Sequence, residues 1–71
     1  MFEVGDIVSF NIITNHQIIR KVGRIDTIYY YNERDDWFVV AIPAENHLFG
    51  RVGYEITPVS RDEAMIWKLE N

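Results

Sequence analysis

The alternation of apolar and polar side chains along the chain predicts mostly β-strands. A first strand is expected over residues 6–14, where Val8, Phe10 and Ile12 lie two positions apart and therefore on one face. Ile7 and Ile13 are apolar exceptions on the other face. Residues 15–17, Asn-His-Gln, predict a turn that ends this strand.

A second, long strand is expected over residues 18–31. Its length exceeds that of most strands in small domains. Gly23 predicts a bend or bulge within it, and the three-residue step from Ile25 to Ile28 also interrupts strict alternation. We therefore expect this strand to curve.

A third strand is expected over residues 37–42. Both of its faces are apolar, which is typical of a central strand. The charged segment 32–36 predicts a turn, so the second and third strands should pair as an antiparallel hairpin. Residues 43–53 are expected to be irregular, and residues 54–59 to form a short strand or a single helical turn.

The last residues, about 61–70, predict a short α-helix. Ser60 and Glu63 match a capping box, in which each side chain bonds a backbone N–H of the other. One apolar stripe is formed at helical spacing by Met65, Ile66 and Leu69. Trp67 falls off that stripe, so we expect it either to pack sideways against the sheet or to contact a second chain.

Length and composition indicate one domain, 1–71, that is soluble and cytoplasmic. Its 71 residues include no cysteine, so a dense aromatic core or self-association must supply the stability that disulfides give other small domains. Neither a secretory signal nor a membrane-spanning apolar run is recognisable. The net charge of −4 is ordinary for a soluble protein and argues against a dedicated nucleic-acid binder.

Three segments of the predicted strands share a pattern: Gly5-Asp6-Ile7-Val8, Val22-Gly23-Arg24-Ile25 and Trp37-Phe38-Val39-Val40. Together they resemble the SH3-like small β-barrels, such as KOW and Tudor domains. The resemblance covers residues 4–59 and implies a mainly β fold, a small antiparallel barrel followed by the C-terminal helix. It also implies a bacterial or phage origin. Many functions share this fold, so it assigns none of them.

The sequence contains no recognisable set of catalytic residues, because the candidate side chains are either missing or expected to have structural roles. Thiol chemistry is excluded, the glycines match no phosphate-binding pattern, and Ser60 is expected to cap the helix. His16 and His47 lie in expected loops with no motif around them, and two histidines do not fill a zinc site. We therefore expect no enzyme, no metal and no cofactor.

The aromatic residues of the second hairpin predict a binding surface for a protein. Because Tyr29, Tyr30 and Tyr31 are consecutive, a strand must point them to both faces. Tyr29, Tyr31 and Trp37, rimmed by Asp35 and Asp36, form an expected site for a basic or proline-rich peptide. The alternative is a domain so small that the terminal helix covers these rings.

Two other functions remain open at this point. A KOW-like nucleic-acid module would use Arg20, Lys21 and Arg24 of the second strand. These cations would otherwise only protect an exposed strand from edge pairing. A structural subunit that forms a homodimer or larger homo-oligomer is the third reading, to which an outward Trp67 would contribute.

Overall fold

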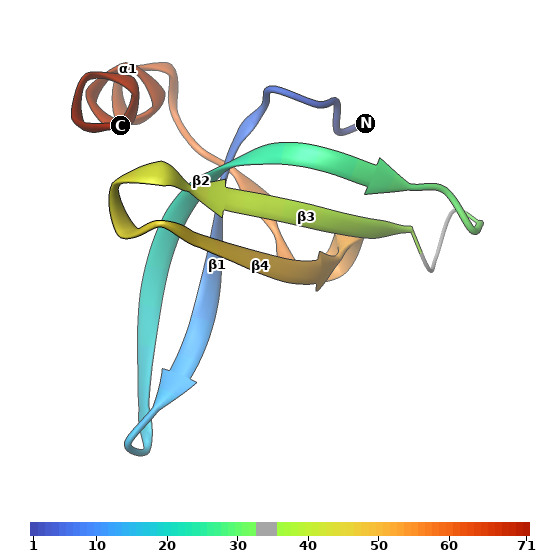
Figure 1. Ribbon diagram of the computed structural model, residues 1–71, viewed down its shortest axis with the longest axis horizontal. Coiled ribbons are helices and arrows are strands. Elements are labelled where there is room, and N and C mark those ends of the chain that lie inside the picture. The colour runs from blue at the N-terminus through green and yellow to red at the C-terminus, as the bar shows by residue number, and fades with distance from the viewer. Residues whose placement is uncertain (33–35) are drawn as a thin grey trace.

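The computed structural model describes residues 1–32 and 36–71 as a strongly bent antiparallel sheet with one α-helix (Figure 1). The elements follow in chain order as β1 (Ile7–Thr14), β2 (Gln17–Tyr29), β3 (Trp37–Ile42), η1 (Pro43–Glu45), β4 (His47–Val52), η2 (Gly53–Glu55), β5 (Thr57–Pro58) and α1 (Arg61–Glu70), where η marks a 3₁₀ turn. The prediction of a mainly β chain with a short C-terminal helix is confirmed.

The sheet has the strand order β4-β3-β2-β1-β5 with antiparallel neighbours throughout. β5 returns to β1, where Val8 lies opposite Pro58 and Ser9 opposite Thr57. Within the described residues no ladder joins β4 to β5, so the sheet is curled but open. The expected central position of β3 and its antiparallel pairing with β2 are both confirmed.

The β1–β2 hairpin turns through two residues, Asn15 and His16. Both have positive φ angles, 48° and 64°, which is the geometry of a two-residue turn whose twist matches the flanking strands. Thr14 and Gln17 form the closing pair. The turn lies where it was expected, one residue shorter than predicted.

The bend in β2 is a bulge at Asp26, where the register to β3 shifts between Ile25 and Thr27. The step in the apolar pattern after Ile25 therefore marked it correctly. Gly23 has a different role, because a Cβ there would lie 2.6 Å from the Cγ1 atom of Val40. Glycine allows β2 and β3 to approach closely at this point.

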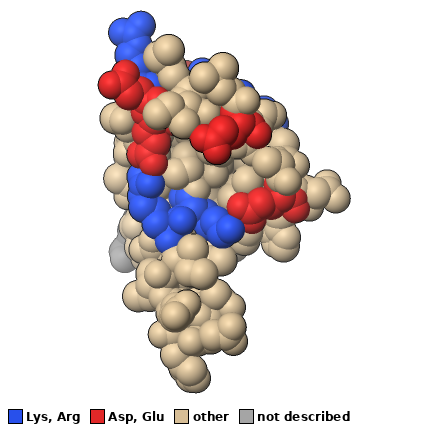
Figure 2. Space-filling model, turned by 90° about the vertical axis from the view of Figure 1, so that its left-hand side faces the viewer, with Lys and Arg blue, Asp and Glu red and all other residues tan. Residues whose placement is uncertain are grey.

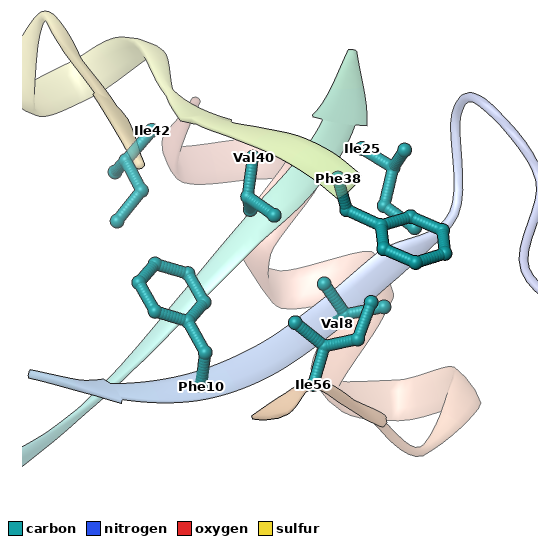
Figure 3. Close-up of a cluster of buried hydrophobic side chains, with 7 residues drawn as sticks. All are labelled: Val8, Phe10, Ile25, Phe38, Val40, Ile42 and Ile56. Carbon is teal, nitrogen blue, oxygen red and sulfur yellow. The ribbon is translucent and has the colours of Figure 1, made fainter. Parts of the chain in front are cut away.

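One face of the sheet, here called the inner face, carries the hydrophobic core (Figure 3). Its buried members are Val8, Phe10, Ile25, Phe38, Val40, Ile42 and Ile56. Phe2 packs edge-on against Phe38 with ring centroids 5.5 Å apart, and Phe49 lies 5.0 Å from Phe10. Period-two alternation places these side chains together, as the sequence pattern of β1 and β3 predicted.

Helix α1 lies against the opposite, outer face through Trp67, so one of the two predictions for this residue, packing against the sheet, is confirmed, whereas the predicted apolar stripe is not the docking face. Trp67 is its buried residue, and the Trp67 indole N–H donates to the Val22 carbonyl at 2.7 Å. The predicted apolar stripe of Met65, Ile66 and Leu69 is exposed instead. One large ring with a polar N–H covers the sheet and satisfies a strand carbonyl at once, whereas the stripe offers no hydrogen-bond donor.

The helix start matches only half of the predicted capping box. Ser60 Oγ accepts from the Glu63 N–H at 3.1 Å, as expected. The Glu63 carboxylate, however, bonds the guanidinium of Arg20 on β2 at 2.6 and 2.9 Å. A charged donor makes the stronger bond to a carboxylate, so this contact replaces the one back to the cap residue.

The region 43–53 is not irregular but contains β4. The structure places His47, Phe49 and Arg51 opposite inner-face residues of β3, and Leu48, Gly50 and Val52 on the outer face. Gly50 and the charged Arg51 concealed the strand pattern. Residues 54–59 combine both predicted alternatives, because the turn η2 is followed by the two-residue β5.

Candidate functional site

Four aromatic side chains at one end of the sheet form the aromatic patch. Their exposed fractions are 51% for Tyr29, 74% for Tyr30, 71% for Tyr31 and 39% for Trp37. The patch lies at the end of β2 and the start of β3, away from α1 (Figure 1). The terminal helix therefore does not cover these rings, which was the alternative left open by the sequence.

Trp37 is held in a defined position on the outer face. It lies directly opposite Tyr29 on β2 and opposite Val52 on β4. A Cβ at Gly50 would overlap the Trp37 indole, so this ring rests against the backbone of β4 where a side chain is missing. One side of the indole is thus in contact with the sheet, and the rest of it is open to a ligand.

Two carboxylates lie beside the patch. Asp36 precedes Trp37, and Asp36 Oδ1 accepts from the Tyr31 N–H at 3.1 Å, which ties the two sides of the hairpin together. On the other side, Glu55 Oε1 accepts from the N–H of Val52, the cross-strand neighbour of Trp37, at 3.0 Å. Asp35, the other predicted rim residue, lies outside the described residues.

The three predicted nucleic-acid-binding cations do not form one surface. Register places Lys21 on the inner side, opposite Phe10, and Arg20 and Arg24 on the outer side. Each makes an ion pair: Arg20 with Glu63 at 2.6 Å, Lys21 with Glu45 at 2.9 Å, and Arg24 with Asp26 at 3.1 Å. Figure 2 shows the resulting mixture of basic and acidic side chains. A phosphate backbone would have to compete with these carboxylates.

The Arg20–Glu63 pair shifts the pKa values of both of its members. The hydrogen bond from Arg20, aided by its charge, lowers the pKa of Glu63, and the same bond raises the pKa of Arg20. Both groups are solvent-exposed, so the pair joins α1 to β2 without burying charge. It is a structural contact of the helix rather than an anion-binding site.

A second surface was not predicted from the sequence. Beyond their contacts with β5 and β3, β1 and β2 continue as a hairpin of residues 11–19, here called the isoleucine arm, which projects from the body (Figure 1). Ile13 and Ile18 face each other on its outer side and are 80% and 72% exposed. Ile13, an apolar exception to the alternation of β1, was the available signal.

No group of three or more His, Asp or Glu side chains gathers among residues 1–32 and 36–71 as a metal ion would need. Ser9 is buried mid-strand and its hydroxyl donates to the Thr57 carbonyl at 3.4 Å. No helix in the described part of the chain is long and apolar enough to cross a membrane.

Comparison with known proteins assigns no family to this arrangement. No protein-family model, no curated protein and no solved structure matches the chain.

Proposed function

We propose that this protein is a non-catalytic binding module whose aromatic patch binds a basic, extended segment of another protein. The observation that carries the proposal is the exposure of Tyr29, Tyr30, Tyr31 and Trp37 at one end of the sheet. Tyrosine and tryptophan are the side chains most enriched where protein interfaces gain their affinity. Each ring offers a large contact area with few rotatable bonds to immobilise.

Charge favours a basic ligand over an acidic one. Asp36 is the sequence neighbour of Trp37, Glu55 accepts from the N–H of its cross-strand neighbour Val52, and the whole chain carries a net charge of −4. Arginine and lysine side chains stack on the faces of Trp and Tyr rings, and carboxylates at the rim pair with the same cations. Stacking on the rings and pairing with the carboxylates therefore both favour a ligand that contains arginine or lysine.

For the fold, we propose an SH3-like partial barrel. The five strands run as a continuous antiparallel meander in which β5 returns to β1, and the bulge in β2 supplies the curvature that such a sheet needs. In this reading Tyr29 and Trp37 of the patch lie on the outer surface of the barrel wall, so a ligand bound to them leaves the core intact.

The proposal is tested by selection from a phage-displayed library of random peptides against the immobilised protein. We expect enriched peptides to contain Arg or Lys beside apolar residues, and Tyr31→Ala to weaken binding of a selected peptide by about tenfold, as for a hot-spot residue. Tyr31 lies outside the strands and is exposed, so this substitution leaves the core untouched. Nuclear magnetic resonance shifts should locate the bound peptide at Tyr29 and at the Trp37 indole.

The control is Leu69→Ala, which removes an exposed apolar side chain from α1, away from the aromatic patch (Figure 1). It should leave peptide affinity within about twofold, the scatter of a neutral surface change. The proposal fails if no peptides are enriched, if they lack basic residues, or if Tyr31→Ala binds them as well as the unaltered protein does.

A further inference from the structure

The isoleucine arm exposes apolar side chains on both of its faces. Register pairs Ile12 with Ile19 on the inner side and Ile13 with Ile18 on the outer side. A two-stranded hairpin has little stability by itself in water, so extending one beyond the body with isoleucines on both sides has no evident structural purpose within one chain. Exposed apolar clusters of this kind mark interaction surfaces.

The strand edges of the arm stop being covered at a defined point. Near the body, Arg51 Nη2 donates to the Asn11 carbonyl at 3.1 Å on the β1 edge, and the Trp67 indole donates to the Val22 carbonyl on the β2 edge. In the described structure, β5 pairs with β1 only at Val8 and Ser9, and β3 pairs with β2 only from Arg24 onward. Past these points both edges of the arm lack a neighbouring strand.

The arm is also uncharged, unlike the body. Residues 11–19 contain no Lys, Arg, Asp or Glu, although the chain has 7 basic and 11 acidic residues. The lower part of the molecule in Figure 2, which holds the tip of the arm, accordingly shows no charged side chains. Two copies that meet through their arms keep their bodies, each with a net charge of −4, apart.

We propose that the isoleucine arm is a homodimer interface, in which the arm of one copy packs against the same arm of a second copy. A two-fold interface brings one patch against itself, so each patch must be its own complement. Uncharged isoleucine pairs meet this condition, whereas the acidic body does not. The isoleucine arm is separate from the aromatic patch, so dimerisation through the arm and peptide binding at the patch can be tested independently.

The first test measures the mass of the full chain by sedimentation equilibrium between about 1 and 500 µM, the range of weak to moderate dimers. We expect the mass to approach twice 8.4 kDa at the upper end. The double variant Ile13→Thr with Ile18→Thr keeps β-branched residues in the strands and should raise the dimer Kd at least about tenfold.

The control variant is Met65→Gln with Leu69→Gln, which removes two exposed apolar side chains from α1. It should leave the Kd within about twofold of the unaltered chain. Circular dichroism establishes that both double variants keep the fold. A chain that stays monomeric throughout, or a dimer that the control variant weakens as much as the arm variant does, overturns the proposal.

A second test uses the absence of cysteine from the chain. Thr14→Cys at the arm tip should give an intermolecular disulfide under mild oxidation, and Leu48→Cys, exposed on β4, should not. Added salt should strengthen the dimer, because it screens repulsion between two acidic bodies and leaves apolar contact in place. Cross-linking at Leu48 alone, or a dimer that salt dissociates, contradicts an arm-to-arm interface.

Discussion

The two ends of the β1–β2 hairpin contain the same kind of side chain in opposite surroundings. At the base, Ile25 is fully buried in the core, where β2 pairs with β3. In the arm, Ile13 and Ile18 project into solvent from the same pair of strands. Isoleucine and strand geometry are common to both ends, so the difference comes from the neighbouring elements.

The base is covered because other parts of the chain return to it. β3 and β5 pair with its edges, and α1 lies on its outer face. None of the described elements reaches the arm tip. Apolar residues that fold a small domain and apolar residues that assemble it are thus distinguished by what packs on them, and not by their type.

The largest expected difference between the two ends is in the cost of the same substitution, isoleucine to alanine. Ile25→Ala leaves a cavity in the core and should lower the free energy of unfolding by about 2–5 kcal/mol. Ile18→Ala removes a solvent-exposed side chain and should change it by less than about 0.5 kcal/mol. Denaturant unfolding at a concentration that keeps the chain monomeric measures both, and equal losses would mean that the arm packs on the body.

A smaller effect is expected at Arg51, which lies on the boundary between the two ends. Its guanidinium is 5.1 Å from the centre of the Phe10 ring and donates to the Asn11 carbonyl. Arg51→Gln loses the stacked cation and this bond, and should cost about 1–2 kcal/mol of unfolding free energy. Amide hydrogen exchange should also accelerate in residues 11–19 more than in the core.

The control for this prediction is Arg61→Gln, because Arg61 is an exposed arginine on α1. We expect it to leave exchange in the arm unchanged. If Arg51→Gln accelerated exchange evenly over the whole sheet, Arg51 would be a general core contact and not a boundary of the arm.

The smallest effect concerns the exposed ion pair that joins α1 to β2. Arg20→Gln should return the pKa of Glu63 toward its ordinary value, because the hydrogen bond that lowers it is lost. A carboxylate whose pKa is lower in the folded than in the unfolded state stabilises the fold above the unfolded pKa. This contribution disappears as the pH falls through the folded pKa.

The stability difference between the unaltered chain and Arg20→Gln should therefore be present near pH 7 and vanish in strong acid. Carbon-13 titration of the Glu63 carboxyl and unfolding at both pH values measure it. An identical Glu63 titration in both proteins would show that the pair does not persist in solution.

Local patterns in the sequence predicted the elements that local physics determines. The apolar alternation of β1 and β3, the step after Ile25 and the cap at Ser60 all correspond to observed features. The face of α1 was predicted wrongly, because a preference for Trp67 over the Met65 stripe depends on the Val22 carbonyl, which only the folded sheet presents. β4 was missed because glycine is unusual inside a strand. Gly50 is accommodated there by the Trp37 ring of β3, a contact that the sequence alone does not reveal.

Of the surface features, only the exposure of the tyrosines follows from a local pattern in the sequence. Three consecutive tyrosines had to expose at least one ring, and the structure exposes all three. The pairing of Arg20 with Glu63 and of Lys21 with Glu45 joins residues far apart in the chain, which no sequence spacing indicated. The projection of the arm depended on where β3 and β5 stop, and therefore on the whole topology.

The contact of Trp37 with Gly50 couples the residue types that positions 37 and 50 can carry. A side chain at position 50 would displace the indole, while a smaller residue at 37 would uncover the strand beneath it. Among homologous sequences, a large aromatic residue at 37 should accompany glycine at 50, and the two should change together. Such paired change is a mark by which distant relatives of this chain can be recognised in genomes.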